Sequence, residues 1–223
     1  MSTPAPWSNP TTPNLADYFA FVGTQIENLL VNLPFATGTA TAGTATTLTD
    51  STQTWATGQW VNYYLDDETA GFVVPVSANT ASVLTFATQA NAAAADDTYL
   101  IVPPIVNTSF QVALSIVNDA LSVAGTGTYV LAAYNLALDR LVNYAPDQAG
   151  QTYFQRLRAA FHLVSTSVGA VSSASDQGTS ASIVNPDWMR NMTMRDIQTL
   201  KTPWGREYMG LAQAYGPTVW VSV

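Results

Sequence analysis

Residues that could carry out acid–base, nucleophilic or metal chemistry are few in this sequence and stand far apart. His162 is the only histidine, cysteine is absent, and glutamate occurs only at Glu27, Glu68 and Glu207. A serine hydrolase would need His162 beside an activated serine, but the sequence has no Gly-x-Ser-x-Gly motif. The separated glutamates do not form the carboxylate pair of a glycoside hydrolase. We therefore expect no catalytic residue, and we place His162 on the exposed face of a helix.

The densest group of possible metal ligands is Asp66, Asp67 and Glu68. Carboxylate oxygens of this kind can bind calcium, but the group lacks the alternating Asp and Asn spacing of an EF-hand loop. A solvent-exposed β-turn is the favoured interpretation. The glycines Gly125 and Gly127 are not followed by the third glycine of a dinucleotide-binding motif, and no phosphate-binding loop motif is present. The sequence predicts neither a metal site nor a cofactor site.

Four aromatic residues lie close together in the chain, namely Trp55, Trp60, Tyr63 and Tyr64. Such side chains can stack on bases or sugars. Because the surrounding segment has few other large residues, we expect them to form its hydrophobic core. A carbohydrate-binding or adhesive module stays open as an alternative.

The composition favours a protein that is covered by other proteins. Only 10% of the 223 residues are charged, against about 25% in an average soluble protein. Residues 1–139 hold ten acidic residues and no Lys or Arg, whereas all seven basic residues follow. The net charge of −8 argues against non-specific nucleic-acid binding, which needs clustered positive charge. The uneven distribution predicts a charge dipole suited to oriented protein contacts.

The N-terminal residues 1–14 lack the basic and apolar regions of a secretory signal. Their four prolines predict an extended arm. No apolar run approaches the ~20 residues that span a bilayer. We therefore expect a soluble chain that is synthesised in the cytoplasm.

Helical and strand-like patterns alternate along the chain. A helix is predicted over residues 15–32, with Asn14 as its N-cap and Pro34 at its end. Residues 36–102 are rich in Thr, Ala, Gly and Val. Strands are predicted there at 44–49, 60–65, 72–76, 82–86 and 99–102. Short strands at this spacing are typical of a small closed barrel or a sandwich.

Helical periodicity returns after Pro104. Three apolar stripes, which end near Gly125, Pro146 and Val164, predict three amphipathic helices that pack antiparallel. The Ser- and Gly-rich residues 165–182 predict a long flexible loop.

Two short helices and a strand are predicted at the C-terminal end. Thr193 with Asp196 predicts a capping box, and Thr202 before Pro203 predicts the start of the next helix. Residues 218–223 alternate as a strand, which must pair with its own sheet or with that of a neighbouring subunit.

The predicted fold class is α+β: an antiparallel helical bundle with an inserted small β-barrel or β-sandwich domain and a C-terminal extension. The predicted parts are an N-terminal arm and first helix (1–35), the inserted β-domain (36–102), the helical bundle (103–166), and a flexible loop with a C-terminal docking segment (167–223).

The C-terminal docking segment is the predicted protein interface. It combines basic residues with Trp and Tyr, and Trp, Tyr and Arg are enriched at interface hot spots. The alternative is that its aromatic side chains cover the helices of the same chain. The candidate interface residues are Trp188, Arg190, Arg195, Lys201, Trp204, Arg206, Tyr208, Tyr215 and Trp220.

Two segments resemble bacteriophage structural proteins. Residues 38–65 (GTATAGTATTLTDSTQTWATGQWVNYYL) with 71–86 (GFVVPVSANTASVLTF) resemble a small module that recurs in them. Residues 192–220 (MTMRDIQTLKTPWGREYMGLAQAYGPTVW), together with the helical region before them, resemble a class of phage neck proteins, the head–tail connectors or adaptors.

The resemblance implies a function in the virion. Head–tail connectors form rings, usually of twelve copies, that join the portal to the tail, and many are helical bundles with a C-terminal arm that docks on the portal. It therefore implies a structural protein with the portal and tail or neck proteins as partners, no cofactor, no enzymatic activity, no membrane and no sequence-specific nucleic acid. Another phage tail or baseplate component is the alternative within this class.

Overall fold

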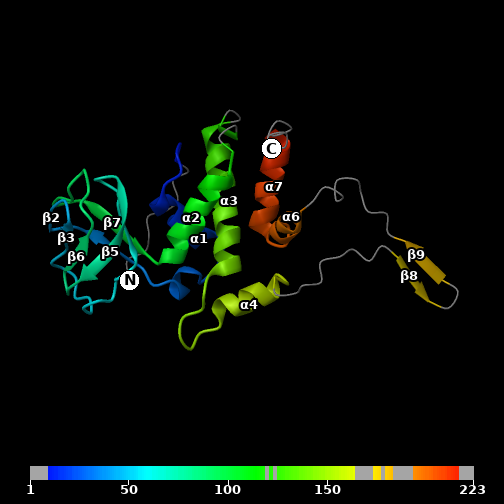
Figure 1. The fold of residues 1–223 in the computed structure, drawn as a ribbon, viewed down its shortest axis with the longest axis horizontal. Coiled ribbons are helices and arrows are strands. Elements are labelled where there is room, and N and C mark those ends of the chain that lie inside the picture. The colour runs from blue at the N-terminus through cyan, green and yellow to red at the C-terminus, as the bar shows by residue number, and fades with distance from the viewer. Residues whose placement is uncertain are drawn as a thin grey trace.

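A curled antiparallel sheet and a layer of packed helices lie next to each other in the protein (Figure 1). The structure, a computed structural model, describes residues 10–118, 121–122, 125–163, 173–176, 179–182 and 193–215. The mixed helix-and-strand class predicted from the sequence is confirmed. The predicted segment boundaries at residues 35, 102 and 166 stay predictions.

Seven strands between residues 36 and 102 form one antiparallel sheet. Its order is β1-β7-β4-β5-β6-β3-β2. The strands are β1 (Ala36–Thr39), β2 (Ala42–Gly43), β3 (Thr47–Thr49), β4 (Tyr64–Asp67), β5 (Phe72–Asn79), β6 (Val83–Phe86) and β7 (Thr98–Val102). β1 and β2 were not predicted, because residues 36–43 contain no large apolar side chain that would reveal an alternating pattern.

The sheet is open, so the predicted closed barrel is wrong. β1 pairs with β7 and β2 pairs with β3, but β1 and β2 do not pair with each other. They follow one another along the chain, and the chain changes its pairing partner at Ala40, whose N–H donates to the Asp97 carbonyl over 2.8 Å. One segment thus supplies both edges of the open sheet.

The curled sheet encloses its own hydrophobic core. Trp55 and Trp60 are buried there and meet edge to face with ring centroids 6.4 Å apart, and Trp55 meets Tyr99 in the same way at 6.3 Å. The Tyr99 hydroxyl donates to the Asp50 carboxylate over 2.7 Å, and Asp50 also accepts from Thr52. The prediction that the aromatic residues form this core is confirmed for both tryptophans.

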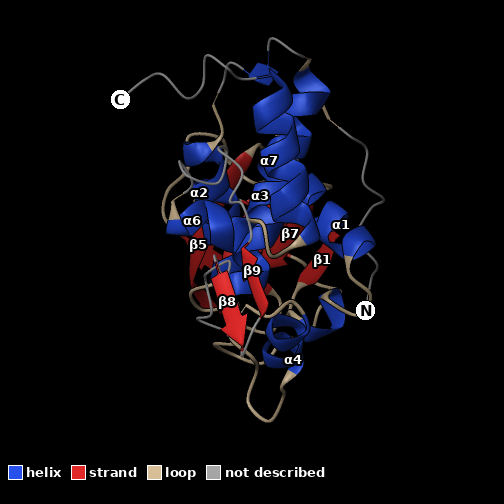
Figure 2. Cartoon of the chain, turned by 90° about the vertical axis from the view of Figure 1, so that its right-hand side faces the viewer, coloured by secondary structure: helices blue, strands red, loops and turns tan. Residues whose placement is uncertain are grey.

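The helices form a second layer beside the sheet (Figures 1 and 2). In Figure 1, α2 and α3 meet at the top, and α7 runs upward beside the descending α3, so these neighbours are antiparallel. The helices are α1 (Leu15–Gln25), the short 3-10 helix η1 (Leu30–Asn32), α2 (Pro104–Ile116), α3 (Thr126–Tyr144), α4 (Tyr153–Ala160), α6 (Met194–Thr199) and α7 (Pro203–Tyr215). No helix in the described part of the chain is both long enough and apolar enough to cross a membrane.

α3 is the centre of the helical layer. Ten of the eleven residues from Ala132 to Val142 are buried, and Arg140 is half-buried, so neighbours surround the helix on all sides. α1 joins it through Tyr134, whose ring contacts Tyr18 at 5.6 Å and whose hydroxyl bonds the backbone of Asn14 at 3.2 Å. A helix that is apolar all round is the expected occupant of such a central position.

Several predicted boundaries shift because single residues adopt the left-handed conformation. α1 ends at Gln25 instead of residue 32, and Asn28 follows it with a φ of 61°. α4 is shorter than predicted, and His162, with a φ of 54°, lies in the exposed turn after it rather than within a helix. Gly125 begins α3 as its N-cap, whereas the sequence placed it at a helix end.

The predicted loop at 165–182 contains two paired strands, β8 (Ser173–Asp176) and β9 (Thr179–Ser182). Alternating small residues suit an extended backbone, and Asp176 pairs with Thr179 across a two-residue connection. We call this hairpin the β8–β9 arm. The predicted loop residues outside the two strands, and the predicted strand at 218–223, lie outside the described residues.

Gly38 in β1 tests the packing of the sheet. A methyl group at this position would lie 2.5 Å from the Tyr99 hydroxyl and 2.6 Å from an Asp50 carboxylate oxygen. We expect Gly38→Ala to lower the free energy of unfolding by about 1–3 kcal/mol, as overpacked cores do. Thr39→Ala, at the exposed next position, should change it by less than about 0.5 kcal/mol. Equal denaturation midpoints for the two variants would contradict this packing.

Candidate protein-binding surface

The helices α6 and α7 form the described part of the predicted C-terminal interface, and both begin as the sequence predicted. Thr193 and Asp196 make a reciprocal capping box at the start of α6. The Thr202 hydroxyl accepts the N–H of Gly205 over 2.9 Å at the start of α7. Local hydrogen bonds therefore fix the direction of each helix before it contacts the rest of the chain.

A buried hydrogen bond joins α7 to α3. The Thr202 hydroxyl donates to the Asp139 carboxylate over 2.6 Å, and both side chains are buried. The side-chain amide of Asn143 also donates to Asp139 at 3.2 Å. Burial raises the pKa of Asp139 to about 6, while the hydrogen bond from Thr202 and the charge of Arg140 act in the opposite direction. These contacts hold the start of α7 on the central helix.

Trp204 faces inward, so it packs against its own chain. Its side chain is only 8% exposed, and its ring meets Phe161 edge to face at 5.6 Å. Gly205 beside it has no room for a side chain, since a methyl group there would overlap the Thr199 carbonyl oxygen. Trp204 therefore covers the helices of its own chain, as the alternative interpretation of the sequence expected.

The basic candidates near this corner bond to backbone carbonyls. The half-buried Lys201 donates from Nζ to the carbonyl of His162 at 3.3 Å. The exposed Arg206 donates to the carbonyls of Leu200 at 3.1 Å and Lys201 at 3.4 Å, which lie at the C-terminal end of α6. Cations stabilise a helix C-terminus in this way.

The remaining candidates divide into exposed, half-buried and undescribed residues. Tyr215 at the end of α7 is 50% exposed, and Tyr208 is half-buried against the helical core. Arg195 lies in α6, but its side chain is outside the description. Trp188, Arg190 and Trp220 lie outside the described residues.

Two exposed apolar residues were not predicted. Tyr144, the last residue of α3, is 64% exposed, and Val31 in η1 is 67% exposed. Neither residue lies on the apolar stripes of the predicted helices, so the sequence did not single them out.

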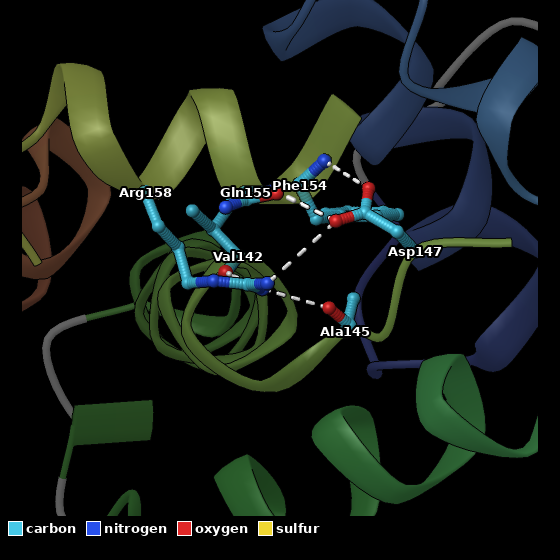
Figure 3. Close-up of polar contacts among 6 residues, drawn as sticks. All are labelled: Val142, Ala145, Asp147, Phe154, Gln155 and Arg158. Carbon is cyan, nitrogen blue, oxygen red and sulfur yellow. Dashed lines mark hydrogen bonds and ion pairs between the residues drawn. The ribbon is translucent and has the colours of Figure 1, made fainter. Parts of the chain in front are cut away.

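The corner between α3 and α4 is held by one carboxylate and one guanidinium (Figure 3). Asp147 accepts the backbone N–H groups of Phe154 at 2.6 Å and Gln155 at 3.0 Å. Arg158 donates to the Ala145 carbonyl at 2.7 Å and lies 3.9 Å from Asp147. This cap was not predicted from the sequence, because Asp147 stands seven residues before the first N–H that it accepts. Arg158 thus has a structural role here.

The predicted exposed turn at the acidic group is wrong for two of its three residues. Asp66 and Asp67 belong to β4 and are 7% and 0% exposed, whereas Glu68 is exposed. The Asp66 carboxylate accepts the N–H of Ala16 in the first turn of α1, and burial together with Glu68 raises the pKa of Asp66 to about 7. Among the described residues, no three His, Asp or Glu side chains come together as a group that could hold a metal ion.

No family model matches the chain, and neither a curated protein nor a solved structure matches it.

Gly205 and Gly210 form a matched pair for testing the docking of α7. Gly205→Ala should lower the free energy of unfolding by about 1–3 kcal/mol, because the new methyl group would push α7 away from α6. Gly210 lies on the exposed side of the same helix with open space around it. Gly210→Ala should therefore raise stability by about 0.5–1 kcal/mol. Chemical denaturation measures both, and a stabilised Gly205→Ala would contradict the described corner.

Asp66 makes stability depend on pH. Its pKa is about 7 in the folded protein against an ordinary value of 3.8, so the folded state binds the proton more tightly. The stability that protonated Asp66 contributes is present below about pH 4 and is lost as the pH rises through 7. Asp66→Asn should therefore become more stable relative to the unmodified protein by up to about 1.4 kcal/mol per pH unit between these two values. A difference that stays constant with pH would contradict this prediction.

Proposed function

We propose that the protein is a structural virion component, a head–tail connector of a tailed bacteriophage that forms a ring between portal and tail. The observation that carries this proposal is the β8–β9 arm, which stands apart from the helices and the sheet in Figure 1. It is one part of the described chain whose shape and composition call for a contact outside the chain.

The arm cannot be stabilised by its own side chains. Ser173 faces Ser182 and Ala174 faces Ala181 across the two strands, so neither face carries a large apolar residue. A two-stranded hairpin alone is marginally stable in water. Among the described residues no strand pairs with either outer edge of the arm. Addition of a strand to such an edge through main-chain hydrogen bonds is a common mode of protein recognition.

The body of the molecule supports a structural function. Its finer architecture, on this proposal, is an antiparallel helical bundle with an inserted β-domain. The buried α3 and the internally bonded Asp139 and Asp50 give it an interior in which the polar groups serve the fold. A rigid body with a projecting arm suits assembly into a ring. We propose the portal, the tail or neck proteins and further copies of this chain as partners, with twelve copies in the ring and the neck of the virion as its place.

The proposal assigns no catalytic, metal or cofactor function to any residue. His162 stands alone in an exposed turn, and it needs no role in this scheme. The same observations would suit another tail or baseplate component, which belongs to the same class. The carbohydrate-binding alternative has less support, because Trp55 and Trp60 are 8% and 4% exposed and their faces are covered by other aromatic rings.

Removal of residues 173–182 tests the proposal. We expect the shortened protein to keep its thermal midpoint, because Figure 1 shows the arm apart from the folded body. We expect it to lose the ring that native mass measurement and negative-stain images should show for the full chain, both alone and with purified portal.

A double variant, Ser175→Ala with Ser180→Ala, serves as the control. These residues face each other across the arm, and alanine keeps the backbone groups of both strands. It should assemble like the unmodified protein. The proposal is wrong if the full chain stays a monomer with and without portal, or if the chain without the arm assembles equally well.

A further inference from the structure

The outer side of edge strand β1 borders a groove of about 490 Å³. Ala36 and Thr37 of β1 line one side of it, and Gln53, Trp55 and Trp60 line the other. The remaining lining residues are Leu30, Val31, Leu33, Pro34, Phe35, Gln59 and Gln148. None of the lining residues is charged, and the exposed Val31 belongs to the rim. The groove therefore suits an uncharged segment with apolar side chains.

The backbone of β1 has groups free to pair inside this groove. Residues of an antiparallel strand alternate between bonding one neighbour and the other. The N–H of Ala40 donates to the Asp97 carbonyl, which precedes β7. By this alternation, Gly38 and Ala36 also direct their backbone groups toward β7. Thr37 and Thr39 then direct their N–H and C=O groups to the free edge. In the described part of the protein, the buried Thr37 Oγ1 has no hydrogen-bond partner.

A second polar atom beside the groove is also unpaired among the described residues. The indole Nε1 of Trp60 is buried and has no hydrogen-bond acceptor, although buried indole N–H groups usually find one. Unpaired buried groups are destabilising, and a segment that enters the groove would bring backbone carbonyls and amides close to both atoms. This supports an extended peptide as the occupant.

The sequence of this chain offers one segment of the required kind. Residues 218–223 (TVWVSV) are uncharged, alternate in polarity and lie outside the described residues. In an extended conformation, Val219, Val221 and Val223 would share one face. These three valine side chains match the apolar lining of the groove, whereas Trp220 would lie on the opposite face with Thr218 and Ser222.

The tail cannot reach the groove of its own molecule. α7 ends at Tyr215, and three Cα–Cα steps through Gly216 and Pro217 lead to Thr218, a span of at most about 11 Å. α7 packs on α3, and Figure 1 shows the helical layer between α7 and the strands. Packed helices lie about 8–10 Å apart, and α3 with its neighbours stands between α7 and the sheet, so the distance from α7 to β1 exceeds this span.

We propose that residues 218–223 of one copy add as an extra strand to β1 of a second copy. This inference rests on the self-association in the proposed function and names the contact through which copies join. The end of α7, which precedes the donor segment, and the groove at β1 lie on opposite sides of the helical layer in Figure 1, so the contact is head to tail. A contact of this kind generates a closed ring when its rotation closes, and a filament when it does not.

The absence of cysteine allows a direct test by disulfide trapping in the full chain. Full-length Thr37→Cys protein is mixed with full-length Val219→Cys, Val221→Cys or Val223→Cys protein under mild oxidation, because Thr37 lines the groove that the valine face would enter. Facing residues of paired strands have Cβ atoms about 4.5–5.5 Å apart, close enough for a disulfide after small adjustment. We expect at least one pair to give about tenfold more mixed disulfide dimer than the control, because strand pairing raises the effective concentration of the two thiols.

The control replaces Thr37→Cys by Ser77→Cys, an exposed position on the interior strand β5. The inference is overturned if copies associate by native mass but the Thr37 pairs give no more mixed dimer than the Ser77 pairs. That outcome leaves the proposed function standing. If the chain stays monomeric with and without portal and no pair forms, both the inference and the proposed function are wrong.

Discussion

The structure depends on buried carboxylates that are held mainly by hydrogen bonds. Six of the ten acidic residues within the first 139 positions are buried in the described structure, although that part of the chain holds no Lys or Arg. A buried carboxylate that has no cationic partner must accept hydrogen bonds from backbone N–H or hydroxyl groups, or become protonated. The buried residues are Asp17, Asp50, Asp66, Asp67, Asp97 and Asp139.

This constraint explains how the elements are joined. Asp66 on β4 accepts a backbone N–H from the first turn of α1, which ties the sheet to the helical layer. Asp139 on α3 accepts the hydroxyl that begins α7, and the half-buried Asp147 caps α4. In each joint a carboxylate on one element satisfies a donor at the start of the next, where a helix leaves its N–H groups unpaired. The acidic half therefore stabilises the interior, and its contribution to a surface dipole is smaller than the charge count suggests.

The low number of charged residues also limits what the surface can offer to a partner in the proposed function. Arg158, Arg206 and Lys201 bond to carbonyls of their own chain, so these cations are already engaged in the free molecule. What the described surface offers to a partner is main-chain hydrogen bonding, at the two edges of the β8–β9 arm and along β1. Contacts of that type depend little on side-chain charge. They fit the proposal that this low-charge protein joins further copies of itself and proteins of a virion.

The sequence by itself determined the features that depend on neighbouring residues. Asn14, Thr193 and Thr202 act as helix caps as predicted, because a cap bonds an N–H only two or three residues away. The alternation of helical and strand patterns likewise gave the mixed fold class. Only the tertiary structure decided which side chains are covered. Trp204 turns inward and Asp66 is buried because partners distant in the sequence, Phe161 and Ala16, lie against them. Residue pattern alone does not specify such long-range contacts, and for the same reason it did not reveal that the sheet stays open at β1.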